Sequence, residues 1–488
     1  MKKYLLGIDQ GTSALKAVLF DFSGSAVLSE TADYNVEYGA AGIAEQNPEI
    51  WYSAAAQAIK KITSGIAAEE IAAIGVDGIS WSPVFIDEKG KVLAKTPIWL
   101  DTRAHLECCE IDALVSAEKL FEICGNPLTA NYGTPKALWF KNRRPRIFSK
   151  TYKILQSNSF LVYRLTGEAS QDKCQSYAYH FYDMRTGKYN YEILKKLGLD
   201  SGLFPVPVDC DTVVGGITRE AAAQTGLRAG TPVIAGGLDA ACAALGAGVT
   251  ASGQTQEQGG QAGGMGICID NYVSNKNLIL SAHVIPGKWL LQGGTTGGGG
   301  ALKWFNAQFG NGQSFDVLTS GITEKPSKDG VIFLPYMRGE RSPLWNPKAK
   351  GLFYGLSYET SQKDLVRAVL EGVAFSLRHN LETACQSGAK ATGLLSTGGS
   401  ANSKIWTQIK SDVTGLPISV PASKEATAKG AALLAGRAAG IYRSYEEAAE
   451  RTVKETAKYF PDKANKKTYD SLYEKYLEIG GAMAPTWK

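Results

Sequence analysis

The chain has 488 residues and a formal net charge of +5; 44% of its residues are hydrophobic and 20% are charged. This composition is typical of a soluble globular protein, and the length exceeds what a single core ordinarily fills, so we expect two large domains. Basic blocks are absent, which argues against a nucleic-acid surface. No run of about 18 apolar residues could span a membrane, and the first apolar run is too short for a signal peptide.

Cysteine and histidine usage indicates a reducing compartment. The eight cysteines include no Cys-x-x-Cys pair and stand mostly in apolar surroundings, as expected of reduced core residues in the cytoplasm. The four histidines show no ligand spacing with cysteine, histidine or carboxylate. We therefore predict a cytoplasmic protein without a structural metal.

The first part of the chain alternates apolar runs with glycine-containing turns. Residues 3–24 contain two such runs around a short polar turn, which predicts a β-hairpin. Residues 71–78 and 96–101 are then expected to form strands, and helices are expected around residues 135–142 and 158–165. The pattern indicates an α/β fold.

Asp239 stands where a strand should end and a helix should begin. Residues 231–236 (TPVIAG) form a short apolar run closed by glycine, and small residues follow in GGLDAACAALGAG, residues 236–248. Asp239 either caps the helix, a contribution of about 1 kcal/mol, or serves as a catalytic base. This segment alone leaves both interpretations open.

The second half repeats features of the first. Residues 253–270 place a glycine-rich turn before an apolar run, much as residues 7–20 do, which suggests that one fold is built twice. Residues 392–421 predict a strand, a double-glycine turn, a helix that stops near Gly415 and another strand, and residues 425–440 predict a helix of small side chains. We place the domain boundary near residue 250, giving domains 1–249 and 250–488 with a cleft between them.

The N-terminal hairpin carries the residue types that a transferred phosphoryl group requires. Asp9 could hold Mg²⁺, the turn of Gly11, Thr12 and Ser13 offers amides and hydroxyls, and Lys16 returns on the second strand. A Walker A sequence and a convincing G-x-G-x-x-G are both absent. An ordinary hairpin turn with an exposed strand lysine is the alternative.

Five segments resemble one family. GIDQGTSALKAVLFD (residues 7–21) resembles the opening phosphate loop of the FGGY carbohydrate kinases, members of the actin and hexokinase superfamily. Residues 236–248, 333–356, 370–382 and 396–418 resemble, in the family's order, its catalytic-aspartate segment, its long second-domain signature, the following helix and the adenosine-binding region. They are distributed, in the family's order, over nearly the whole length of the chain.

The resemblance implies two actin-like (ribonuclease H-like) domains, each with a mixed sheet flanked by helices, that close on a sugar and ATP. The N-terminal domain would bind sugar and phosphate, and the C-terminal domain the nucleotide. Asp239 would accept the proton of the attacking hydroxyl, kept ionised by its helix N-terminus, and Asp9 would position Mg²⁺. Phosphate would lie near Gly11, Thr12, Ser13 and Lys16, and the nucleotide near Gly298, Gly299, Gly398, Gly399, Ser400 and Asn402.

The chain departs from the family at the second phosphate loop. The family's Gly-Thr-Ser-Gly is replaced here by Gly260, Gln261, Ala262 and Gly263, so two hydroxyls are lost. The Gln261 amide and the backbone amides can still donate hydrogen bonds. The change therefore predicts an altered affinity for the terminal phosphates and a changed nucleotide preference, with a non-catalytic relative as the alternative.

A second departure concerns the sugar. Many xylulose kinases carry Met-His-Gly where this chain has Ser80, Trp81 and Ser82. Trp81 could stack on a sugar and donate its N–H, or be a core tryptophan. Asp101 and Arg103 resemble the substrate loop, with a salt-bridged turn as the alternative. Single polar contacts decide hydroxyl recognition, so these changes bear directly on the substrate.

The expected activity is ATP- and Mg²⁺-dependent phosphorylation of a small sugar, with a ketopentose such as xylulose as the first candidate. Gluconate or a polyol is the alternative within the same chemistry. A sugar-sensing protein built on the kinase fold is the alternative from another class. The expected partner is a small-molecule sugar, without nucleic acid or membrane, and the sequence leaves a homodimer open.

Overall fold

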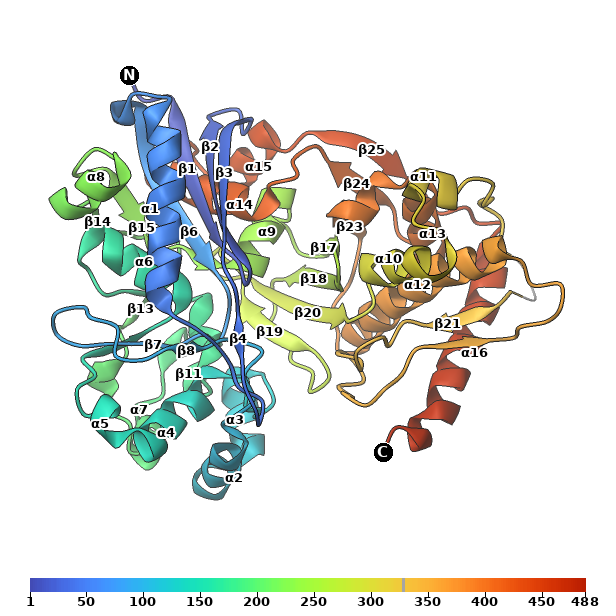
Figure 1. The fold of residues 1–488 in the computed structure, drawn as a ribbon, viewed down its shortest axis with the longest axis horizontal. Helices are drawn as coiled ribbons and strands as arrows, with labels where there is room; N and C mark the ends of the chain where they lie inside the picture. The colour runs from blue at the N-terminus through green and yellow to red at the C-terminus, as the bar shows by residue number, and fades with distance from the viewer. Residues whose placement is uncertain (327–329) are drawn as a thin grey trace.

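The computed structural model describes residues 1–326 and 330–488. Two seven-stranded mixed sheets organise the molecule (Figure 1). The first has the strand order β14-β15-β6-β1-β2-β3, with β16 also paired to β6. Its strands are β1 (Tyr4–Gln10), β2 (Ala14–Asp21), β3 (Ala26–Asp33), β6 (Ile71–Gly78), β14 (Val213–Gly216), β15 (Pro232–Ile234) and β16 (Gly237–Leu238).

The second sheet repeats the topology of the first. Its order is β19-β20-β18-β17-β23-β24-β25. In each sheet three consecutive neighbours are antiparallel (β1-β2-β3 and β17-β18-β20), and two parallel strands follow on the other side (β6-β15 and β23-β24). The prediction of one fold built twice is confirmed. The strands are β17 (Gln254–Gly259), β18 (Gly263–Ile269), β19 (Ile279–Ala282), β20 (Trp289–Thr295), β23 (Gly393–Thr397), β24 (Ile418–Pro421) and β25 (Glu455–Tyr459).

Helices cover both sheets, and short strand pairs lie outside them. The helices are α1 (Pro48–Ser64), α2 (His105–Leu114), α3 (Ala117–Cys124), α4 (Gly133–Arg143), α5 (Pro145–Phe148), α6 (Ser157–Thr166), α7 (Tyr191–Lys196), α8 (Arg219–Thr225), α9 (Asp239–Ala247), α10 (Gly299–Phe309), α11 (Phe315–Leu318), α12 (Gln362–Gln386), α13 (Lys404–Thr414), α14 (Ala426–Ala438), α15 (Tyr445–Thr452) and α16 (Lys466–Met483). The short strands are β4 (Glu37–Tyr38), β5 (Ala44–Gln46), β7 (Val84–Ile86), β8 (Thr96–Pro97), β9 (Lys153–Leu155), β10 (Gln171–Asp172), β11 (Tyr182–Asp183), β12 (Lys188–Tyr189), β13 (Pro207–Val208), β21 (Ile332–Leu334) and β22 (Leu352–Tyr354).

Most expected elements are confirmed. The hairpin is β1 and β2, whose register pairs Asp9 with Lys16, and the strand expected at 71–78 is β6. The strand expected at 96–101 is wrong beyond its first two residues, because the Asp101 amide donates to the Ile98 carbonyl (2.8 Å) and closes a turn there.

Helix α14 belongs to the C-terminal half of the sequence but packs on the first sheet. It contacts β1, β6 and α9 near the middle of the molecule (Figure 1). Glycines make this approach possible: a Cβ on Gly7 would lie 1.9 Å from the Ala428 oxygen, and one on Gly430 would lie 1.8 Å from the Cys242 oxygen. The backbone of α14 therefore contacts the backbones of β1 and α9 directly.

Among the described residues, one group of three side chains has metal-ligating atoms that are all close to one another. Ligand atoms of Asp172, Cys174 and Cys210 lie within 4.8 Å of one another. The protein already engages them, since Asp172 accepts hydrogen bonds from Asn158 and Gln175, and the Cys174 thiol lies 3.0 Å from the Ala282 oxygen. The eight cysteines form no disulfide. Within 1–326 and 330–488, none of the helices has the length and apolar character needed to cross a membrane.

Candidate active site

The ends of three strands bring three carboxylates together. β1 and β16 both run parallel to β6, with Asp9 and Gly237 opposite Asp77. Asp239 follows β16 directly as the first residue of α9. Because the carboxyl ends of parallel strands meet at one edge of a sheet, Asp9, Asp77 and Asp239 lie close enough for their charges to interact.

Asp239 has the surroundings of a proton acceptor. Its Oδ1 accepts a hydrogen bond from the Ala240 amide (2.6 Å). The pKa of Asp239 is raised to about 7, mainly by burial and also by the negative charge of Asp9. The Ala240 hydrogen bond acts in the opposite direction. A pKa near neutrality suits general base catalysis.

Two expectations about Asp239 need correction. The helix begins at Asp239 itself, Leu238 occupies the N-cap position, and no side chain caps this end; the cap interpretation is therefore wrong. The helix N-terminus does not keep the carboxylate fully ionised at neutral pH, because burial and the negative charge of Asp9 act in the opposite direction.

Asp9 and Lys16 have different settings, although they pair across the hairpin. Burial raises the pKa of Asp9 to about 6, while the charge of Lys16 lowers it. Lys16 donates to the Glu425 carboxylate at 2.7 Å. The lysine is thus held in an ion pair with the C-terminal half, and its contact with phosphate stays a prediction.

A cavity of about 610 Å³ lies between the two halves of the chain. Seven of the residues predicted from the sequence line this cavity. They come from three segments of the first half and one loop of the second half: Thr12, Ser13, Ser80, Trp81, Asp239, Gly260 and Gln261. Sequence reasoning assigned no role to several polar or aromatic residues of the same wall: Trp99, Tyr177, Gln256, Gln258, Gln292 and Arg341. Gly11 is not part of this wall, and its amide closes the hairpin turn on the Ala14 oxygen at 3.0 Å.

A second cavity of about 600 Å³ holds most of the predicted nucleotide residues. Gly299, Gly399, Ser400 and Asn402 line it, together with residues that were not predicted: Lys303, Phe315, Asp316 and Trp406. Gly298 and Gly398 are not among the residues that line it. Gly260 and Gln261 border both cavities, so the loop that departs from the family lies between them.

Backbone contacts fix this loop. The Gly299 amide donates to the Gly260 oxygen (2.7 Å), and the Gly300 amide donates to the Gln261 oxygen (2.9 Å). A Cβ on Gly300 would lie only 2.4 Å from Gln261 Nε2. The glutamine side chain therefore occupies space that glycine at position 300 leaves open.

Trp81 is both a core residue and part of the cavity wall. Its ring stacks on Tyr132 with centroids 4.2 Å apart, and its φ of 55° is uncommon for a bulky residue. The buried indole Nε1 has no hydrogen-bond partner among the described residues. Both interpretations from the sequence describe part of this arrangement, and a contact of the indole N–H with the sugar stays a prediction.

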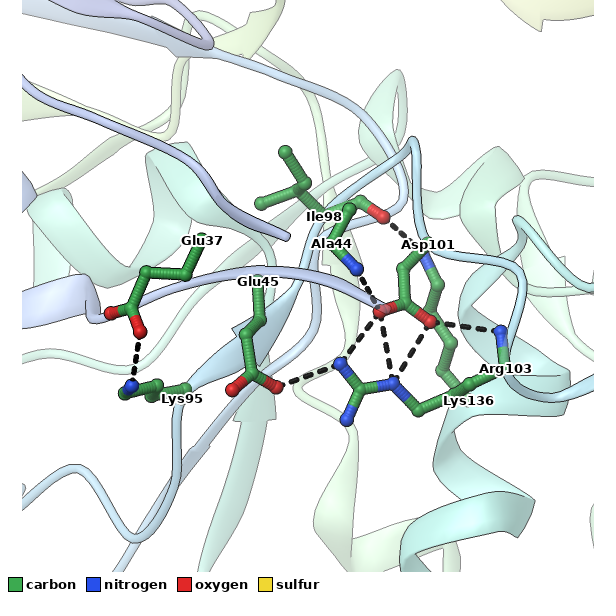
Figure 2. A network of polar contacts seen from close by, with 8 residues as sticks. All are labelled: Glu37, Ala44, Glu45, Lys95, Ile98, Asp101, Arg103 and Lys136. Atoms are coloured by element: carbon green, nitrogen blue, oxygen red, sulfur yellow. Dashed lines mark hydrogen bonds and ion pairs between the residues drawn. The ribbon is translucent and has the colours of Figure 1, made fainter. Parts of the chain in front are cut away.

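Asp101 and Arg103 lie in a network of their own (Figure 2). Asp101 is fully buried and accepts hydrogen bonds from the Ala44 amide and the Arg103 guanidinium, which also pairs with Glu45 at 2.7 Å. Neither residue lines the 610 Å³ cavity. The structure shows the salt-bridged turn, and a role in substrate binding stays a prediction.

Arg341 is a cation in the cavity wall. Among the described residues its guanidinium has no salt bridge and no hydrogen-bond acceptor, and it lies 5.9 Å from the Trp99 ring centroid. Burial lowers the pKa of Arg341. The segment RGERSP could have drawn attention to it, because an arginine between apolar segments needs a partner.

The repeated sheet topology and the cavity between the halves define an actin-like α/β fold, as expected. The chain belongs to the FGGY family of carbohydrate kinases: residues 4–246 match the family's N-terminal domain and residues 270–439 its C-terminal domain. It is accordingly a sugar kinase, a phosphotransferase of a family that uses ATP as the phosphate donor.

Relatives of two substrate types are similar to the chain over almost its whole length. A xylulose kinase of Bacillus subtilis is 29% identical over 98% of this chain and 96% of its own, and a gluconokinase of the same organism is 28% identical over 98% and 96%. The structure of gluconate kinase from Lactobacillus acidophilus has a TM-score of 0.92 at 25% identity, covering 100% of this chain and 99% of its own. That of xylulose kinase from Rhodospirillum rubrum has a TM-score of 0.90 at 26% identity, covering 99% of each chain.

Proposed function

We propose that this protein phosphorylates a hydroxyl of a ketopentose such as xylulose with ATP. One observation carries the proposal: Gly260 and Gln261 border both cavities, and Asp239 stands in one of them. The sugar then lies beside Asp239 in the N-terminal half, 1–249, and the nucleotide lies in the C-terminal half, 250–488. The xylulose kinases among the relatives support the choice of sugar.

In this mechanism Asp239 accepts the proton of the attacking sugar hydroxyl. Thr12 and Ser13, at the hairpin turn, donate hydrogen bonds to the phosphoryl oxygens as charge develops on them. Gln261 takes the place of the family's hydroxyls from the opposite side. These groups are held on strand ends, so they need little rearrangement during transfer.

Asp9 is the proposed metal residue. Asp9 is partly exposed, and its charge interacts with those of Asp77 and Asp239, acidic surroundings that suit a hard divalent cation. Bound Mg²⁺ would neutralise charge on the phosphates.

The nucleotide is proposed to lie along Gly398, Gly399, Ser400 and Asn402 on one side and Gly298 and Gly299 on the other. Gly398 has a φ of 85°, which the turn after β23 requires. A glycine surface lets a flat purine approach the backbone.

A substrate panel tests the proposal. With Mg²⁺ and ATP, we expect ADP formation to be fastest with one ketopentose among ketoses, aldonates and alditols. Coupled ADP detection measures it, and calorimetry with the same sugars detects binding. Sugar binding without ADP formation across the panel would favour the sugar-sensing alternative.

A second candidate is an aldonate such as gluconate, and Arg341 favours it. An unpaired guanidinium in the cavity wall can bind a carboxylate with paired, charge-assisted hydrogen bonds. If an aldonate is the substrate, Arg341→Gln should raise its KM about 10- to 100-fold. An unchanged aldonate KM in this variant would remove the argument for the acid.

Trp81→Phe tests the sugar contact that replaces the family's histidine. We expect the KM for the sugar to rise about 5- to 10-fold with kcat nearly unchanged, because the variant keeps the ring but loses one hydrogen bond. Steady-state kinetics measure both constants. Trp304→Phe in α10, outside the cavity wall, is the control. Equal KM values for wild type and Trp81→Phe would show that the indole N–H does not contact the sugar.

A further inference from the structure

Asp77 carries a carboxylate that the protein does not balance. The residue is fully buried. Neither Oδ1 nor Oδ2 accepts a hydrogen bond within residues 1–326 and 330–488. Burial and the negative charges of Asp9 and Asp239 raise the pKa of Asp77 well above its usual range, so its ionised form is stable at this position only beside a compensating cation.

Among the residues that the structure describes, the neighbours of Asp77 do not supply such a group. Asp9 faces it across the β1–β6 ladder, and Asp239 approaches from the end of β16; both are acidic. Lys16 is the basic residue of the hairpin, and Glu425 already holds it at 2.7 Å. Three carboxylates therefore converge where the lysine of the hairpin is already paired, an environment that favours a bound divalent cation.

Asp9 and Asp77 form a pair on the sheet, and Asp239 is separate from them. Asp9 and Asp77 are in register on adjacent parallel strands, so their side chains leave the sheet on the same face. Asp239 instead lines the 610 Å³ cavity, which neither of the other two does. Asp9 is partly exposed, which gives a small ion access to the pair.

We propose that Asp77 is a second carboxylate ligand of the divalent cation, acting together with Asp9. Mg²⁺ takes oxygen ligands and is usually held by one or two carboxylates, with water and substrate phosphates completing its shell. The inference rests on the proposed kinase function, because the phosphates come from the nucleotide. It leaves Asp239 free to receive the proton of the sugar.

The test uses Mn²⁺ as a spectroscopic substitute for Mg²⁺ on the full-length protein. Electron paramagnetic resonance titrations measure free Mn²⁺ with and without ADP, and thermal unfolding measures the rise in Tm that Mg²⁺ produces. Asp77→Asn keeps the shape of the side chain and removes the charge. We expect its Mn²⁺ dissociation constant to rise about 10-fold or more and its Mg²⁺-dependent rise in Tm to shrink.

Asp33→Asn provides the matched control, because it makes the same chemical change at an exposed residue of β3 and should bind Mn²⁺ as wild type does. Asp77→Ser is a second variant in case the amide disturbs folding, and circular dichroism without metal verifies that each variant is folded. Wild-type affinity for Mn²⁺ in both Asp77 variants would overturn the inference, as would a wild-type protein that binds no Mn²⁺ with or without ADP.

The inference and the proposed function fail in different ways. Asp77-dependent Mn²⁺ binding without phosphorylation of any sugar in the panel would refute the function and leave the metal site standing. If the protein phosphorylates a sugar and the Asp77 variants bind Mn²⁺ as tightly as wild type, the proposed role of Asp77 is refuted and the proposed function stands.

Discussion

Replacing Asp239 by asparagine is expected to lower kcat by about 10²- to 10⁴-fold, the range contributed by a positioned general base. Asparagine keeps the size of the side chain and can still accept the Ala240 hydrogen bond, but it cannot take the proton of the hydroxyl. The KM values for sugar and ATP should change little, because neither cavity loses volume. A coupled assay of ADP formation measures the effect, and full turnover would rule out Asp239 as the base.

The same substitution should stabilise the folded protein at alkaline pH. The folded-state pKa of Asp239, about 7, lies above its ordinary value of 3.8 because of burial. The contribution of this carboxyl group to the free energy of unfolding is therefore fully present below pH 3.8, where the group is protonated. It is lost as the pH rises through about 7, where the buried group ionises. A shift of this size corresponds to ~4 kcal/mol; because the side chain is partly exposed, we expect about 1–2 kcal/mol.

Thermal unfolding at two pH values checks this. The Tm of Asp239→Asn should exceed that of wild type at pH 8, and the difference should nearly vanish at pH 4. Asp33→Asn, on exposed β3, should match wild type at both. A lower Tm for Asp239→Asn at pH 8 would contradict the assignment of burial as the cause of the raised pKa.

Gly430→Ala is expected to destabilise the protein by about 3 kcal/mol, at the upper end for overpacking in a core. A methyl group at this position would lie 1.8 Å from the Cys242 oxygen, where the backbones of α14 and α9 touch. Neither helix can yield without moving from the strands on which it packs. Denaturant unfolding monitored by circular dichroism measures the loss.

Gly481→Ala supplies the comparison for this experiment. Gly481 lies in α16, and a Cβ there would meet nothing within 4 Å. Alanine is the better helix former by about 1 kcal/mol, so this variant should be slightly more stable than wild type. Similar changes in both variants would mean that the α9–α14 contact does not limit side-chain size.

Local patterns predicted the elements and part of the site. The alternation around Gly11 was sufficient for the hairpin. The acidic residue between an apolar run and a helix drew attention to Asp239, but its role as a base was implied only by the family resemblance. Asp77 was not predicted as a site residue, because nothing in the neighbouring sequence distinguishes it from other residues of the strand. Its place beside Asp9 depends on the register of β6 with β1. That register is set by packing between distant segments.

The walls of the cavity show the same limit. Trp99, Tyr177 and Arg341 come from three separate segments and meet only in the folded chain. Asp101 and Arg103 were predicted as substrate residues but form an ion pair with each other. The sequence alone does not distinguish charged residues that pair within the protein from charged residues that bind a ligand.

The position of α14 has a consequence for how the protein is made. When residues 1–249 have left the ribosome, every strand of the first sheet exists, but the helix that covers one face of β1 and β6 does not. The glycine-lined groove of Gly7 and Gly75 stays open until residues 426–438 are synthesised. The first half therefore completes its fold only after nearly the whole second half has been translated, so the two halves mature together.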